Sequence, residues 1–167
     1  AHAAECLQQG RDARRGWEKL FKKYEKAYPE LADEWKRWHS PLSLKHLQAV
    51  ESLRPHKEKA EATRSSSGDA IGKLAALIPN LVGGSADLAP SNKTYIAGGG
   101  DFSAENRAGR NLRFGVREHA MAAISNGIAL HGGLRVFCAT FFVFTDYMKA
   151  AMRLSAIMEL PVIYVLT

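Results

Sequence analysis

Residues 112–121 read LRFGVREHAM, and this stretch decides the fold. Its apolar start before a glycine predicts a short strand over 112–115, and the apolar pattern beyond predicts a helix over 118–132. Glu118 begins that helix beside an apolar core, where a carboxylate is costly unless something uses its charge. We therefore predict that Glu118 is a site residue. The simpler alternative is a glutamate favoured by the dipole at a helix start.

Strands and helices alternate on both sides of this stretch. The apolar spacing predicts a helix that ends at Pro79, a strand over 81–82, a strand over 134–139, a helix over 141–158 and a strand over 160–166. The last strand has few polar residues, as expected for a strand buried on both faces. This alternation predicts an α/β fold, a parallel sheet with helices on both faces and right-handed crossovers.

The first part of the chain has a different pattern. Residues 11–38 predict two helices with aromatic residues at three- and four-residue steps, which we interpret as packing residues. Prolines and charges interrupt residues 39–62 and predict a linker, with one short helix over 43–52. We therefore divide the chain into a helical linker segment, 1–63, and an α/β domain, 64–167.

Composition excludes several classes of protein. The chain is 46% hydrophobic and 24% charged, which is ordinary for a globular domain. The net charge of +6 comes mostly from a helical segment of mixed sign, typical of a solvated face, so we expect no nucleic-acid and no membrane partner. Cys138 lies in an apolar strand pattern and predicts a buried thiol. No cluster has metal-ligand spacing, so we expect no metal site in this chain.

Polar loops follow the predicted strands at 83–92, 115–118 and 139–142. Ligands of parallel sheets bind beyond the carboxyl ends of the strands, so these loops predict one site. The first loop reads GGSADLAPSN, where the glycine pair would let the backbone approach a ligand closely. Asp87 and Ser91 would supply an acceptor and a hydroxyl, and an Asx-type turn is the alternative.

Three aromatic residues follow the strand over 134–139. Phe141, Phe144 and Tyr147 recur at three-residue steps and would share one helix face. This spacing is usual for core packing and also suits a pocket for an aromatic heterocycle. We favour the pocket because the rings begin at the carboxyl end of a strand.

These motifs resemble the pyrimidine-binding domain of transketolase, a thiamine-diphosphate enzyme. The resemblance runs from about Arg64 to Thr167 and rests on GGSADLAPSN, on RFGVREHA and on the pattern T-F-x-x-F-x-x-Y from Thr140. It implies that Glu118 is catalytic and hydrogen-bonds a ring nitrogen of the cofactor's aminopyrimidine. The cofactor-binding residues that it implies are Asp87, Glu118, Phe141, Phe144 and Tyr147.

The resemblance also implies how the substrate is held. Arg64 stands 23 positions before Asp87, the separation expected in the family. Arg64 and Ser91 would contact the phosphate of the sugar substrate, and the planar guanidinium suits a phosphate because it donates two hydrogen bonds at once. A solvent-exposed arginine is the alternative for Arg64 alone.

As a member of this family, the chain would belong to an enzyme that moves a two-carbon ketol unit from a ketose phosphate to an aldose phosphate, in the pentose phosphate pathway or the Calvin cycle. The family implies a cytoplasmic homodimer, with Mg²⁺ or Ca²⁺ bound by a domain absent here. The alternatives are a dihydroxyacetone synthase or deoxyxylulose-phosphate synthase relative, or a non-catalytic split subunit. The chain stops at Thr167 directly after a predicted strand, so we expect an incomplete polypeptide that is inactive alone.

Overall fold

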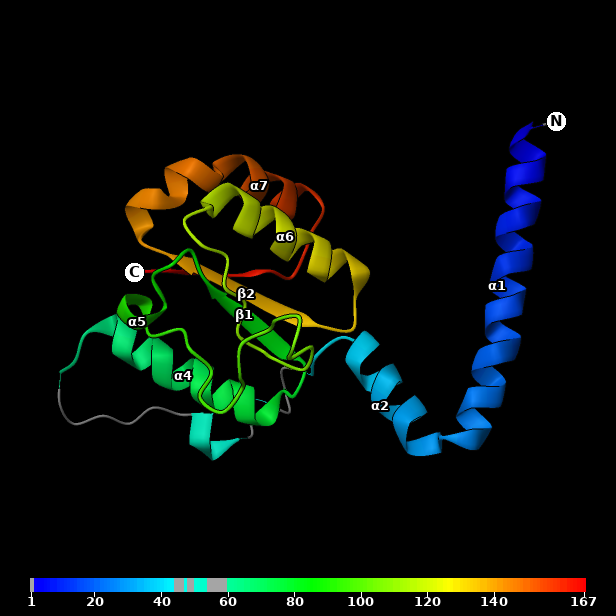
Figure 1. The fold of residues 1–167 in the computed structure, drawn as a ribbon, viewed down its shortest axis with the longest axis horizontal. Helices are drawn as coiled ribbons and strands as arrows, with labels where there is room; N and C mark the ends of the chain where they lie inside the picture. The colour runs from blue at the N-terminus through cyan, green and yellow to red at the C-terminus, as the bar shows by residue number, and fades with distance from the viewer. Residues whose placement is uncertain (1, 44–46, 48–49, 54–59) are drawn as a thin grey trace. The chain divides into compact units, whose positions relative to one another are not determined.

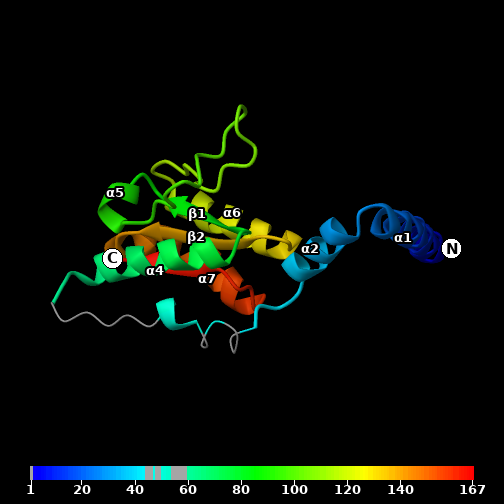
Figure 2. The same ribbon diagram turned by 90° about the horizontal axis from the view of Figure 1, so that it is seen from below.

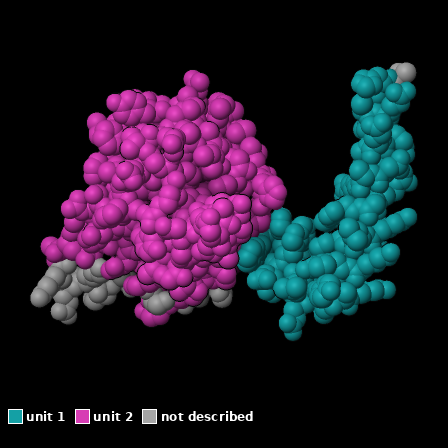
Figure 3. All heavy atoms as spheres, in the orientation of Figure 1, with its two compact units in different colours: residues 1–41 teal, residues 42–167 magenta. Residues whose placement is uncertain are grey.

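The computed structural model of this chain describes residues 2–43, 47, 50–53 and 60–167. Contacts divide the chain into two compact units, residues 1–41 and 42–167, which Figure 3 distinguishes by colour. This boundary rests on contacts alone, so the functional division between residues 63 and 64 remains a prediction.

The first unit is a pair of helices, α1 (His2–Ala27) and α2 (Pro29–His39). Their aromatic side chains pack on one another, with ring centroids 5.1 Å apart for Trp17 and Phe21 and 4.8 Å apart for Phe21 and Trp35. α1 begins well before residue 11. The apolar period misses its first turns because they carry no apolar stripe, and they are held by exposed pairs such as Gln8 Nε2 donating to Asp12 at 3.1 Å.

The second unit contains a three-stranded parallel sheet in the order β1–β2–β3, as the alternation predicted. Leu81 pairs with Arg135, and Phe137 pairs with Ile163, so the carboxyl ends of all three strands lie at one edge. The elements are η1 (Glu51–Leu53), α4 (Thr63–Leu77), β1 (Leu81–Ser85), α5 (Ala89–Asn92), α6 (Glu118–His131), β2 (Arg135–Thr140), η2 (Phe142–Phe144), α7 (Thr145–Ile157) and β3 (Ile163–Leu166).

Helices cover both faces of the sheet, α6 and α7 on one side and α4 and α5 on the other (Figure 1). Neighbouring residues of β2 supply the two cores. Phe137 packs with Ile71 of α4, whereas Cys138 packs with Met121 of α6 and Met148 of α7. The predicted buried thiol is confirmed, and burial raises the pKa of Cys138 to about 11.

The strand predicted over 112–115 is wrong. The chain pairs with β1 only through an isolated bridge between Asn111 and Gly83, and the amide of Leu112 donates to the carbonyl of Gly83 at 2.8 Å. Phe114 then enters the core beneath α6, and Gly115 takes a φ of 67°, so the chain leaves the sheet. Figure 2 shows the segment between α5 and α6 at the β1 side of the sheet.

Other boundaries differ in smaller ways. The helix predicted over 141–158 begins as the 3₁₀ turn η2 and becomes α-helical at Thr145. β3 starts only at Ile163 and lies at one edge of the sheet, with Ile163 49% exposed, so burial on both faces is a wrong expectation for it. The helix predicted over 43–52 falls largely outside the described residues. Within the described part of the chain, no helix is long and apolar enough to cross a bilayer.

Candidate ring-binding site

A hollow of about 500 Å³ opens where β1 and β2 end. Its walls come from three segments that follow β1, precede α6 and begin α7. The structure therefore brings together four of the five residues that the sequence assigned to a cofactor. The lining residues are Ala86, Asp87, Leu88, Val116, Glu118, Phe144 and Tyr147.

A tight turn places Glu118 at this hollow. Gly115 has a φ of 67°, and the amide of Arg117 donates to the Gly115 carbonyl at 2.8 Å. The Arg117 guanidinium donates from Nη1 to the carbonyl of Phe114 at 3.0 Å and so closes the turn. α6 then starts at Glu118, with the amide of Met121 donating to the Arg117 carbonyl at 2.8 Å. Sequence reasoning found Glu118 but gave no role to Arg117.

Glu118 is buried without a partner. It is 7% exposed, and no donor among the described residues forms a hydrogen bond or ion pair with its carboxylate. The positive end of the α6 dipole offsets part of the cost of burying this charge. The remaining cost is explained if a ligand in the hollow supplies the missing donor.

Asp87 also lines this hollow and has a left-handed backbone conformation. The amide of Ala86 still continues the sheet by donating to the carbonyl of Ala139 at 3.0 Å, and the chain then turns sharply at Asp87, whose φ is 60°. Its exposed side chain forms no hydrogen bond with the described residues, so the Asx-type turn is not formed. Left-handed backbone at a residue other than glycine is concentrated at functional sites.

The aromatic side chains form a stepped stack, and two of the three line the hollow. The centroids of Phe144 and Tyr147 are 6.1 Å apart, and Phe141 stacks behind Phe144 at the same spacing. Phe141 precedes η2 in extended conformation, so the three residues do not share one α-helix face as predicted. A contact between Phe141 and a cofactor remains a prediction.

The glycine pair after Val82 is needed for close packing within the protein, and its approach to a ligand stays a prediction. A Cβ on Gly83 would overlap the ring and carbonyl oxygen of Phe137 on β2. A Cβ on Gly84 would overlap the carbonyl oxygen of Leu112. Both glycines therefore allow β1 to be flanked closely on its two sides, because no side chain fits there.

Arg64 and Ser91 lie apart from the first hollow. Arg64 is in the first turn of α4 and Ser91 is on α5, and both are exposed. Residues of both helices line a second hollow of about 460 Å³, but neither Arg64 nor Ser91 is among them. It is lined by their sequence neighbours and by residues near them: Ser65, Gly68, Asp69, Ala89, Pro90, Lys93 and Tyr95.

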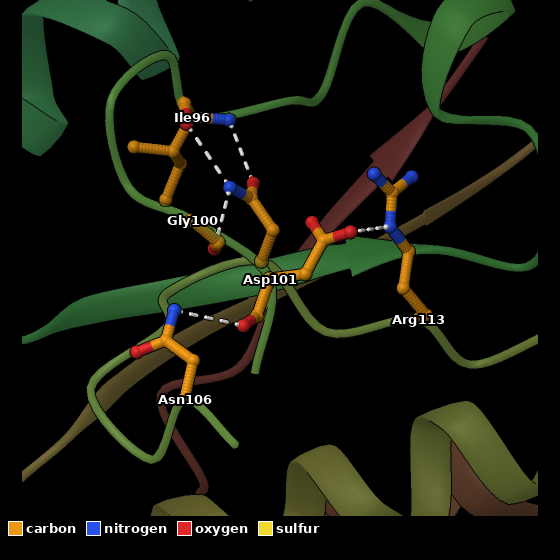
Figure 4. A network of polar contacts seen from close by, with 6 residues as sticks. Ile96, Gly100, Asp101, Asn106 and Arg113 are labelled. Atoms are coloured by element: carbon orange, nitrogen blue, oxygen red, sulfur yellow. Dashed lines mark hydrogen bonds and ion pairs between the residues drawn. The ribbon is translucent and has the colours of Figure 1, made fainter. Parts of the chain in front are cut away.

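The loop after α5 is held by one asparagine that sequence reasoning missed. Asn111 accepts from the amide of Ile96 at 2.8 Å and donates to the carbonyls of Ile96 and Gly100, each at 3.0 Å (Figure 4). Nearby, Arg113 Nε donates to Asp101 Oδ2 at 3.0 Å. No local pattern marks such a residue, because its partners lie far from it along the chain.

This arrangement suits a flat heteroaromatic ring with a basic nitrogen. The apolar and aromatic walls would hold the faces of the ring, and the buried carboxylate would accept a hydrogen bond or share a proton at its edge. Among the described residues, no group of three or more histidine, cysteine or carboxylate side chains could hold a metal ion.

The fold and the hollow together define a parallel α/β domain whose hollow suits an aromatic ring. Residues 59–167 match the family model of the transketolase pyrimidine-binding domain, and the chain belongs to this family. The chain is 51% identical over 170 residues to the transketolase of Halalkalibacterium halodurans, covering 100% of this chain and 25% of that protein. It is 54% identical over 153 residues to the transketolase of Geobacillus stearothermophilus, covering 90% of this chain and 22% of that protein.

Solved structures agree with the sequence relatives. A transketolase from Leishmania mexicana superposes with a TM-score of 0.83 at 39% identity, covering 95% of this chain and 24% of that chain. The resemblance to transketolase that the sequence motifs suggested is thus confirmed. The chain spans about a quarter of the length of these relatives.

Proposed function

We propose that this chain supplies the pyrimidine-binding half of a transketolase active site. The enzyme transfers a two-carbon ketol unit from a ketose phosphate to an aldose phosphate with thiamine diphosphate as its cofactor. One observation carries the proposal: Glu118, buried at 7% exposure without a partner, lines a hollow with aromatic walls. A carboxylate in this setting is suited to exchanging a proton with a ring nitrogen.

The residues of the hollow fit the aminopyrimidine ring. Phe144 and Tyr147 offer aromatic surface, while Leu88 and Val116 add apolar contacts. Glu118 holds a proton against the ring nitrogen, and Asp87 also lines the hollow. When bound, thiamine diphosphate supplies an acidic thiazolium carbon and an electron sink for breaking a carbon–carbon bond. The resemblance assigns its diphosphate and Mg²⁺ or Ca²⁺ to a domain outside this chain.

The proposal extends to substrate, partner and location. Arg64 and Ser91 bind the sugar phosphate near the second hollow, since a guanidinium and a hydroxyl both donate hydrogen bonds to phosphate. A second subunit covers the first hollow and makes a homodimer, because Val116 and Tyr147 on its rim are 75% and 67% exposed. We propose a cytoplasmic enzyme of the pentose phosphate pathway by analogy with the bacterial relatives, although the relative from Craterostigma plantagineum is named as chloroplastic.

Glu118→Gln in the complete enzyme tests the proposal. The amide keeps the size of the side chain but cannot take up a proton, so we expect kcat to fall about 100-fold or more. Exchange of the thiazolium proton of bound cofactor with deuterium should slow with it, while the thermal midpoint stays near that of the parent enzyme.

The matched control is Glu30→Gln, which changes an exposed glutamate of α2 in the same way and should leave both rates unchanged. Near-normal turnover by Glu118→Gln with cofactor bound would exclude the proposed role.

A further inference from the structure

A buried polar cluster lies directly beneath α5. Asn92, the last residue of α5, is fully buried. Its Nδ2 donates to Ser85 Oγ at 3.0 Å, and its Oδ1 accepts from Thr167 Oγ1 at 2.7 Å. Ser85 Oγ shares a further hydrogen bond of 2.8 Å with Thr94 Oγ1. One side-chain amide thus ties α5 to the carboxyl ends of both β1 and β3.

α5 depends on such contacts for its position. It is only 4 residues long, too short to be stable by itself. On its other side it is packed closely against α4, since a Cβ on Gly68 would lie 2.7 Å from both Cβ and the carbonyl oxygen of Lys93. The amide of Asn92 and the close approach at Gly68 therefore fix α5 between the sheet edge and α4.

The position of α5 sets the spacing of Ser91 and Arg64, the two residues proposed to donate hydrogen bonds to the phosphate. Ser91 precedes Asn92 on α5, and Arg64 is in the first turn of α4, and their sequence neighbours Pro90 and Ser65 line the hollow of about 460 Å³. Ser91 is exposed while Asn92 is fully buried, so the two neighbours serve different surroundings. A displacement of α5 would move the Ser91 hydroxyl relative to Arg64, whereas Glu118, Phe144 and Tyr147 of the first hollow are carried by α6, η2 and α7.

We propose that Asn92 is a positioning residue, which holds α5 so that Ser91 and Arg64 engage one sugar phosphate together. The inference rests on the proposed function of Ser91 and Arg64 in binding the phosphate. Asn92 itself is covered and does not touch the substrate. Its loss weakens selection for the phosphate and leaves the chemistry at the cofactor ring intact.

The test compares two ketose substrates that donate the two-carbon unit to the complete enzyme. One is fructose 6-phosphate, and the other is L-erythrulose, which has no phosphate. For Asn92→Ala we expect KM for fructose 6-phosphate to rise about tenfold, on the scale of one or two lost hydrogen bonds. KM and kcat for L-erythrulose should stay within about twofold of the parent values, as expected when only binding of the phosphate is weakened. Thr167→Val removes a single hydroxyl of the cluster and should give a smaller change in the same direction.

Asn80→Ala is the matched control. Asn80 is also a buried asparagine, 4% exposed, and its Nδ2 donates to the carbonyl of Gly133 at 2.8 Å, but it lies at the amino end of β1. This variant should lower the stability of the enzyme without changing the ratio of the KM values for fructose 6-phosphate and L-erythrulose. If Asn92→Ala does not fold, Thr167→Val decides the question by the same comparison of donors.

Each outcome has one meaning. A rise in KM confined to the phosphorylated donor supports the inference. Equal changes for both donors, or none, overturn it. Ser91→Ala and Arg64→Ala separate the two levels: if they raise KM for fructose 6-phosphate and the Asn92 and Thr167 variants do not, only the positioning role fails. If they too leave that KM unchanged, the proposed phosphate site fails and the inference fails with it.

Discussion

Gly84 shows how a single residue can decide whether the site is assembled. It lies in β1, and a Cβ there would overlap the backbone carbonyl oxygen of Leu112, which leads into the turn that carries Glu118. A backbone atom held in a paired segment cannot move aside cheaply. The close approach of these two segments therefore requires glycine at residue 84.

Gly84→Ala should lower the free energy of unfolding by about 1–3 kcal/mol, the usual range for overpacking. The measurement is urea unfolding of this chain followed by circular dichroism. Gly127→Ala is the control, because a Cβ at Gly127 in α6 meets nothing within 4 Å. Alanine favours a helix over glycine, so this control should be neutral or stabilising by up to about 1 kcal/mol. Equal stabilities of the two variants would contradict the steric explanation.

At the scale of elements, the loop between α5 and α6 behaves as a structured part of the site wall. Asn111 is 3% exposed and replaces a regular ladder with three hydrogen bonds to Ile96 and Gly100. Arg113 lies with its guanidinium carbon 5.3 Å from the ring centroid of Tyr95 and adds a second link across the same loop. These side chains reinforce the backbone hydrogen bonds of the loop, such as those from the amides of Arg110 and Asn111 to the carbonyl of Gly100.

Asn111→Ala should loosen this loop specifically. Because it leaves the buried amide of Ile96 without its partner and removes one donor each from the carbonyls of Ile96 and Gly100, we expect a loss of about 1–3 kcal/mol in local stability. Hydrogen–deuterium exchange should therefore speed up over residues 95–102 while α7 stays protected. Asn106→Ala is the control, since Asn106 is exposed and its side chain donates once, to the carbonyl of Asp101 at 3.1 Å. Unchanged exchange in the Asn111 variant would refute this role.

At the scale of the whole molecule, the proposed function makes the hollow one half of an active site. Its rim and the neighbouring surface of η2 and α7 carry exposed apolar residues: Phe142 is 69%, Tyr147 67% and Ile157 70% exposed. Apolar surface of this kind is typical of an interface with another protein surface. The proposed homodimer would cover it with the diphosphate-binding domain of the second subunit.

Subunit mixing tests that arrangement. We expect Glu118→Gln and a variant that lacks a metal ligand in the diphosphate-binding domain to be inactive separately. After the two are unfolded and refolded together in equal amounts, half of the dimers are mixed, and each has one intact site of two. Activity should therefore recover to about a quarter of that of the parent enzyme. No recovery, with mixed dimers demonstrated by mass spectrometry, would mean that each site lies within one subunit.

The sequence by itself determined the class of fold and most of the first hollow. Alternating apolar patterns are local signals, and they correctly predicted α4, α6 and a sheet of parallel strands. The carboxyl-end rule then brought Asp87, Glu118, Phe144 and Tyr147 to one edge, where the structure has them around one hollow. Each of these predictions depends only on residues that are near one another along the chain.

Only the tertiary structure decided the remaining features. Leu112 does not begin a strand because Phe114 is drawn into the core beneath α6. The glycine pair faces protein backbone and side chain, and Asn92 joins strand ends that are far apart in the sequence. These features arise from contacts between distant segments, which no local period records. The periodicity of the sequence reports which face of a helix or strand is buried. Only tertiary packing decides which residues that face is buried against.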